Sequence, residues 1–202
     1  MPFIAKVYIS VVSAAGLAAM LYAFLDPARL QDDPLRLCTY VLLSMLAGTL
    51  KLRLPGLTGT MSPGFVLVLL AISKLTLSET MLLTCAAVVV QCLWRPRQRP
   101  AAVQVLFSVS AAAFSLMLAY QCSHLVRAHG GGDPVPIMLA VATCLYFLAN
   151  SLLFSGVLSL VKGEPLGAIW RQCFMFAIPY YLVGGVVAAV MAVSLSSRLL
   201  YG

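Results

Sequence analysis

The residue best placed to do chemistry in this apolar chain is Asn150, an amide near the middle of the apolar run 135–161. A polar side chain at the centre of a membrane-spanning helix needs a hydrogen-bond partner, and such residues often mark ligand pathways. The commoner alternative is a helix–helix hydrogen bond, which contributes about 0.6–2 kcal/mol. Both interpretations stay open, and Asn150 is a candidate ligand-binding residue.

Further candidates lie around a proline in the last apolar run. Pro179 falls inside the expected helix 172–196 and removes one backbone hydrogen bond, so we expect a kink that can serve as a hinge. Tyr180 and Tyr181 follow it, and their hydroxyl-bearing rings either line a pocket or belong to an interfacial aromatic belt. Gln104 lies nearer a helix end, where we expect it to hydrogen-bond between helices or to contact a ligand.

Most kinds of catalytic and metal site lack their residues here. With only His124 and His129, a multi-histidine haem, copper or zinc site is disfavoured, and we expect His124 to be solvated. The six cysteines follow no metal or disulfide spacing, and we expect no carboxylate buried mid-span for a proton relay. No nucleophile–base pair or paired carboxylates stand out. We therefore predict a non-enzymatic protein with no metal and no cofactor.

One turn-rich polar segment, 51–63, interrupts the first half of the chain. Pro55 and Gly56 form a turn dipeptide, because proline presets φ and glycine accepts positive φ. Gly59 and the neighbouring threonines offer donors to a phosphate, but the arrangement G-x-x-x-x-G-K-[ST] of a nucleotide site is missing. We predict a structured turn that seats the next helix, with Arg53 reaching anionic lipid head groups.

Composition assigns the chain to the membrane. Hydrophobic residues make up 62% and charged residues 9% of the 202 residues, whereas a soluble domain carries about 25% charged residues. Continuous apolar runs favour helices over a β-barrel. We predict an all-α polytopic membrane helix bundle, a single domain over 1–202, with about seven transmembrane helices. The expected spans are 3–25, 35–50, 63–75, 77–94, 101–126, 135–161 and 172–196.

Two local patterns refine these spans. The third is too short to cross a hydrocarbon core of about 30 Å unless its ends lie in protein. Thr76 and Glu79 have capping-box spacing, so the fourth should begin near residue 77. Small residues in 13–19, and Gly184 with Gly185 in the last span, predict close helix–helix contacts.

The positive-inside rule orients the expected spans. Placing the arginine-rich segment 95–99 in the cytoplasm leaves more cations inside than outside. The cations then inside are Lys6, Lys51, Arg53, Arg95, Arg97, Arg99, Lys162 and Arg171. Those outside are Arg29, Arg36, Lys74, Arg127 and Arg198. We predict a cytoplasmic N-terminus and an extracytoplasmic C-terminus, with the same parity if the third and fourth spans form a re-entrant hairpin.

Several short segments carry a family resemblance: LKLRLPGLTGTMS (50–62), ETMLL (79–83), VQCLW (90–94), RPAAVQVLF (99–107), WRQCF (170–174) and PYYLVG (179–184). They resemble the N-terminal multi-helix membrane sensor region of bacterial HD-GYP and GGDEF signalling proteins of the cyclic-di-GMP type. The resemblance covers most of 51–185 and implies a sensory or regulatory module of the bacterial inner membrane. It also implies either an output domain beyond Gly202, after one more helix, or a stand-alone relative without one.

We therefore expect a sensory module that detects a small or lipophilic ligand, or a partner helix, through a shift between two helix packings. One alternative is the substrate-binding component of a vitamin-type transporter, which the uneven and Pro/Gly-interrupted spans resemble in architecture. Another is a structural subunit of a membrane complex. The expected partners are the lipid bilayer, a small molecule, and a second copy or another membrane subunit. The net charge of +7 requires no nucleic acid, because cytoplasmic loops account for it.

Overall fold

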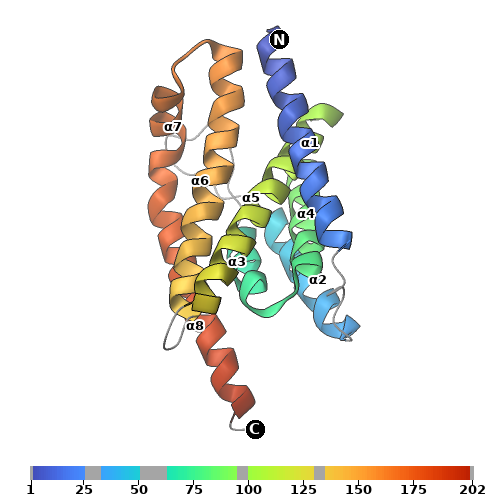
Figure 1. Cartoon of the computed structure of the whole chain (residues 1–202), viewed down its shortest axis with the longest axis vertical. Coiled ribbons are helices and arrows are strands. Elements are labelled where there is room, and N and C mark those ends of the chain that lie inside the picture. The colour runs from blue at the N-terminus through green and yellow to red at the C-terminus, as the bar shows by residue number, and fades with distance from the viewer. Residues whose placement is uncertain (1, 26–32, 51–62, 95–99, 130–134, 201–202) are drawn as a thin grey trace.

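The computed structural model describes residues 2–25, 33–50, 63–94, 100–129 and 135–200, and helices account for nearly all of them. The helices are α1 (Phe3–Leu25), α2 (Pro34–Thr49), α3 (Gly64–Lys74), α4 (Leu77–Leu93), α5 (Ala102–His129), α6 (Val135–Lys162), α7 (Leu166–Phe174) and α8 (Ile178–Leu200) (Figure 1). A 3-10 turn, η1 (Met175–Ala177), separates the last two. The all-α helical bundle is thereby confirmed.

Helix length and composition support a membrane protein. Within the described residues, α1, α5 and α6 are long and apolar enough to cross a membrane, and α7 with α8 adds a fourth crossing if that bent pair is one span. The helices α2, α3 and α4 are apolar but shorter. The described part of the chain therefore contains three or four helices that could span a membrane, and the seven crossings stay a prediction.

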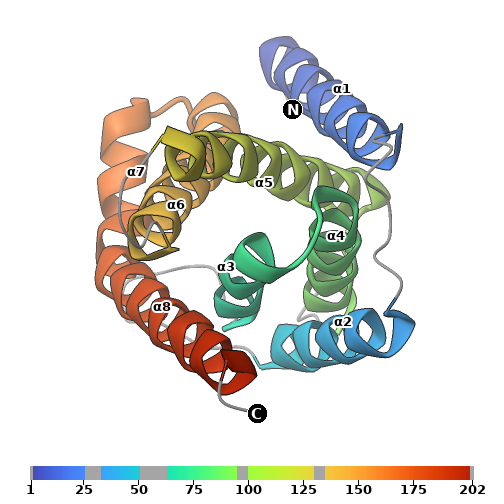
Figure 2. The same cartoon turned by 60° about the horizontal axis from the view of Figure 1, so that its bottom comes forward.

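The shortest apolar helix, α3, lies at the centre of the bundle, inside a ring of other helices (Figure 2). It contacts α2, α4, α6 and α8, while α1 packs on the outside against α5. The sequence GFVLVLLAISK is apolar around the whole helix, and a helix of that kind is stable only when protein or lipid surrounds it. Leu69, Ala71 and Ile72 are accordingly 0% exposed. The eleven residues of α3 span about 16 Å at 1.5 Å per residue.

The break between α3 and α4 is built as the capping-box spacing predicts. Thr76 is the N-cap of α4, and its hydroxyl accepts a hydrogen bond from the Glu79 amide at 3.4 Å. The Glu79 carboxylate accepts one from the Thr76 amide at 2.9 Å. Both bonds satisfy amides that a helix start leaves without intrahelical partners.

The last span differs from the expected helix 172–196. Helix α7 already begins at Leu166, in a stretch expected to be a connection, because Pro165 suits a helix start and Ile169 and Cys173 give α7 a buried face. The axes of α7 and α8 then differ by 58° across η1. Pro179 explains this position, because its ring crowds the carbonyl four residues earlier, that of Met175 in η1.

Candidate functional site: an aromatic cluster with a buried amide

Five aromatic side chains from α3, α6, α7 and α8 form one connected group, here called the aromatic cluster: Phe65, Phe147, Trp170, Tyr180 and Tyr181. Phe65, at the N-terminal end of α3, lies 5.1 Å from Tyr180 and 4.4 Å from Tyr181 between ring centroids. Phe147 is 4.7 Å from Tyr181 and 6.3 Å from Trp170. The spacings are those of favourable aromatic pairs, so the cluster joins four helices at one point.

Some polar groups at this cluster have hydrogen-bond partners and others have none. Trp170 donates its indole N–H to the Ser151 hydroxyl at 2.9 Å, and the Asn150 side chain lies beside the Tyr181 hydroxyl. By contrast, Asn150 Oδ1 and the Tyr180 hydroxyl oxygen are buried, and neither has a hydrogen-bond partner among the described residues. Such orphaned polar atoms are uncommon in native structures, and a missing ligand is one explanation for them.

Local sequence explains how α8 reaches Phe65. A Cβ added at Gly184 would lie 2.1 Å from Phe65 Cζ and 3.1 Å from Val66 Cγ2. One added at Gly185 would lie 2.8 Å from Thr143 Oγ1 on α6. Glycine at both positions lets α8 approach Phe65 and Thr143 closely, as the small-residue pattern predicts, whereas a larger residue would require these side chains to shift.

Three of the sequence candidates, Asn150, Tyr180 and Tyr181, come together at the cluster. Gln104 does not join them. It lies in the first turn of α5, where its Oε1 accepts a hydrogen bond from the Ala101 amide at 3.1 Å, a local capping contact. Pro179 is exposed beside η1.

Four further candidates, Arg53, Pro55, Gly56 and Gly59, lie outside the described residues. The interpretation of 51–63 as a structured turn therefore stays a prediction. Phe65, Phe147 and Trp170 complete the cluster. The sequence alone does not single them out, because residue type and spacing do not distinguish them from the other aromatic residues of the chain.

A second polar group surrounds the C-terminal end of α3, here called the α3 end cap. The Arg36 guanidinium donates to the Lys74 carbonyl, the Tyr120 hydroxyl donates to the Leu75 carbonyl at 3.3 Å, and His124 Nε2 lies 3.0 Å from the Ile72 carbonyl. These donors from α2 and α5 satisfy carbonyls that a helix end leaves open.

The expectation that His124 is solvated is wrong. Its ring is half-buried and stacks on Tyr120 with centroids 4.2 Å apart and planes 20° apart. The two residues are four apart on α5, the spacing that places side chains on one helix face. Glu79 nearby is only 1% exposed, a burial that its capping-box spacing does not predict. Every one of these side chains has a structural partner, so the α3 end cap is a support of the fold.

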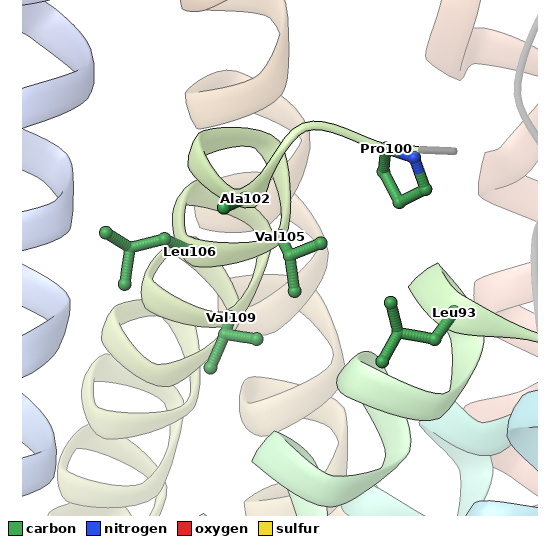
Figure 3. A pocket seen from close by; sticks show the side chains of 6 residues that line it. All are labelled: Leu93, Pro100, Ala102, Val105, Leu106 and Val109. Carbon is green, nitrogen blue, oxygen red and sulfur yellow. The ribbon is translucent and has the colours of Figure 1, made fainter. Parts of the chain in front are cut away.

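A groove of about 540 Å³ lies between the end of α4 and the start of α5 (Figure 3). Its lining is apolar throughout: Leu93, Pro100, Ala102, Val105, Leu106 and Val109. A specific ligand pocket needs a few placed polar groups to orient its ligand, and these six side chains supply none. Among the residues that the structure describes, no group of three His, Cys, Asp or Glu side chains is placed to hold a metal ion.

No protein-family model, no curated protein and no solved structure matches this chain.

Proposed function

We propose that this chain is a non-enzymatic sensory module of the bacterial inner membrane, which binds a small ligand between α3, α6 and α8. The observation that carries the proposal is the pair of buried, unpartnered polar atoms, Asn150 Oδ1 and the Tyr180 hydroxyl oxygen, at the aromatic cluster. Both belong to residues that the sequence alone nominates. The resemblance to HD-GYP and GGDEF sensor regions favours the sensory role.

The free energy available from pairing the two atoms is of the size needed to shift a two-state equilibrium. A buried polar group without a partner costs about 1–3 kcal/mol, so a ligand that pairs both atoms recovers about 2–6 kcal/mol. Moving a two-state equilibrium from 1:99 to 99:1 requires about 5.5 kcal/mol. The two orphaned atoms therefore supply a substantial part of the differential affinity that a ligand needs to select one packing.

The moving element in this proposal is α8. Its helix neighbours are α3 and α6, and it joins α7 through η1 at an angle of 58°. A helix interrupted next to a proline can change its angle at the break without losing further intrahelical hydrogen bonds. Ligand binding would rotate α8 about η1 and move it away from Phe65. The movement of α8 would displace its C-terminal end.

We further propose seven crossings, with α2, α3 and α4 adding to the full-length spans, a cytoplasmic N-terminus and an extracytoplasmic C-terminus. The start of α1 and the end of α8 lie at opposite ends of the molecule's long axis, an arrangement that an odd number of crossings produces (Figure 1). The excess of cations on the predicted cytoplasmic side supports this orientation.

Distance measurements between spin labels test the two packings. Labels replace Val187 on α8 and Leu118 on α5, which are 43% and 38% exposed, in cysteine-free protein in lipid nanodiscs. The wild type should give two distances. Replacing both Asn150 with Leu and Tyr180 with Phe removes the orphaned atoms and should leave one distance. Gln104→Ala, in a capping position on α5, is the matched control and should keep both. A single distance in the wild type that no variant changes contradicts the proposal.

A second candidate function is the substrate-binding component of a small-molecule transporter. The interrupted helix pairs α3–α4 and α7–α8 favour it, because transporter sites are commonly formed where membrane helices are broken. A bound small molecule is expected of both candidates, so the protein partner separates them: co-purification with a transport ATPase supports the transporter. An HD-GYP or GGDEF coding sequence in frame after Gly202 supports the sensor.

A further inference from the structure

We infer that the ligand of the aromatic cluster is a neutral, planar aromatic molecule with at least one N–H or O–H donor. The inference rests on the proposed function, since it takes the cluster to be the binding site.

The walls of the site are rings. Phe65 contacts both Tyr180 and Tyr181, and when α8 moves away, these ring contacts at 5.1 and 4.4 Å are lost. A flat aromatic molecule inserted between α3 and α8 restores stacked or edge-to-face contacts on both sides. A branched aliphatic molecule of the same volume cannot restore these ring contacts.

The two unpartnered polar atoms, Asn150 Oδ1 and the Tyr180 hydroxyl oxygen, determine which hydrogen-bonding groups the ligand must carry. Asn150 Oδ1 is an acceptor only, so its partner must be a donor, whereas the Tyr180 hydroxyl can donate or accept. The Trp170 N–H is not available to the ligand, because it donates to the Ser151 hydroxyl. The ligand must therefore bring at least one N–H or O–H group.

The charge of the site excludes ions. The side chains that build it are aromatic rings, an amide and a hydroxyl, and none of them is ionised near neutral pH. An ionic ligand buried among them has no partner of opposite charge, which is strongly unfavourable in a low-dielectric bundle. Neutral molecules are selected for this reason.

Indole and benzofuran form a matched pair of probes, because they share size and planarity and differ in the N–H donor. Unfolding of the detergent-solubilised full chain is followed with a thiol-reactive fluorogenic dye, in protein that keeps only Cys173, which is 8% exposed in the folded state. The other five cysteines are replaced by alanine, because Cys38 and Cys144 are exposed and would react before unfolding. Indole should raise the midpoint of the wild type by about 2–4 °C more than benzofuran does at equal concentration. The charged analogue indole-3-acetate should give no increase.

Variants assign the effect to the two atoms. Asn150→Leu should remove the difference between indole and benzofuran, and Gln104→Ala should keep it. Tyr180→Phe retains the ring and should reduce the difference between the indole and benzofuran midpoints. It replaces Asn150→Leu in the test if that variant does not fold. Equal midpoints with indole and benzofuran in the wild type, no stabilisation by indole up to its solubility, or an unchanged difference in both site variants would overturn the inference.

The probe experiment and the spin-label experiment can fail independently, so they test the ligand class and the sensory switch separately. If indole binds with the expected preference but the spin-label distances stay fixed, the ligand class stands and the switch fails. If the distances report two packings but indole and benzofuran act alike, the switch stands and the ligand class fails.

Discussion

Gly16 brings the backbone of α1 against the backbone of α5. A Cβ at this position would lie 2.3 Å from the Ser110 carbonyl oxygen and 2.4 Å from Ser110 Cα. Because both atoms belong to the backbone, no side-chain rotation can relieve the contact, and the two helices must separate. The small residues of 13–19 therefore set the distance between α1 and α5.

Gly16→Ala should accordingly destabilise the fold by about 1–3 kcal/mol, the usual cost of overpacking. The midpoint in the dye-based unfolding assay should fall by about 2–4 °C for each kcal/mol. Gly167→Ala is the control, since nothing lies within 4 Å of a Cβ there, and it should be neutral or slightly stabilising. Equal midpoints for the two variants would show that α1 can shift at no cost.

Two buried serines differ in their hydrogen bonding. Ser78 donates to the Ala23 carbonyl at 2.6 Å, linking α4 to α1, whereas the Ser110 hydroxyl is buried without a partner among the described residues. Ser78→Ala should cost about 0.5–1.5 kcal/mol, and Ser110→Ala should be neutral or stabilising, because it removes an unsatisfied group. Unfolding midpoints measured side by side check the order, and a larger loss for Ser110→Ala contradicts it.

Residue type is enough to nominate Asn150, Tyr180 and Tyr181, because a polar atom in an apolar run requires a partner. Residue type does not identify Phe65, Phe147 and Trp170, which become cluster members only through tertiary contact. Gln104 is the opposite case, a polar residue that does not belong to the site. Its side-chain oxygen accepts a hydrogen bond within the first turn of its own helix, and the sequence alone does not distinguish this local contact from an interhelical one.

Side chains from two other helices support α3 at its C-terminal end. Arg36 from α2 and Tyr120 with His124 from α5 reach carbonyls of α3 and of the connection to α4. The shortness of α3 follows from its flanking proline and capping box, so the sequence predicts it. Its end cap depends on contacts between residues 38 to 52 positions apart in the chain, which local patterns do not encode.

The end cap should contribute unequally to stability. Arg36→Leu removes a charged donor and leaves the Lys74 carbonyl short of a partner, so it should cost about 1.5–3 kcal/mol. Tyr120→Phe removes a neutral hydrogen bond of 3.3 Å and keeps the stacking on His124, so about 0.5–1.5 kcal/mol is expected. Arg127→Leu, an exposed cation of α5, should change little. Unfolding midpoints test this order, and a Tyr120→Phe loss above that of Arg36→Leu would reverse it.

For the whole molecule, the number of crossings decides where the C-terminus lies. The full-length spans α1, α5, α6 and the bent pair α7–α8 amount to four, which would return the C-terminus to the side of the N-terminus. If α2, α3 and α4 each cross, the total is odd. If α3 and α4 instead form a re-entrant hairpin and α2 crosses, it is odd as well. The side of the C-terminus thus reports whether the three short helices contribute an odd number of crossings.

Reporter fusions resolve that parity. Alkaline phosphatase fused at the C-terminus should be active, since this enzyme folds only outside the cytoplasm, and green fluorescent protein at the same place should be dark. Green fluorescent protein fused at the N-terminus should be fluorescent in the same cells, which controls for expression and insertion. The positive-inside distribution gives this orientation its physical basis, because cationic loops are retained in the cytoplasm. An inactive phosphatase with a fluorescent protein at the C-terminus would mean that α2, α3 and α4 together cross an even number of times. It would also place the end of α8, the element that we propose to move, on the cytoplasmic side, where it could contact an output domain directly.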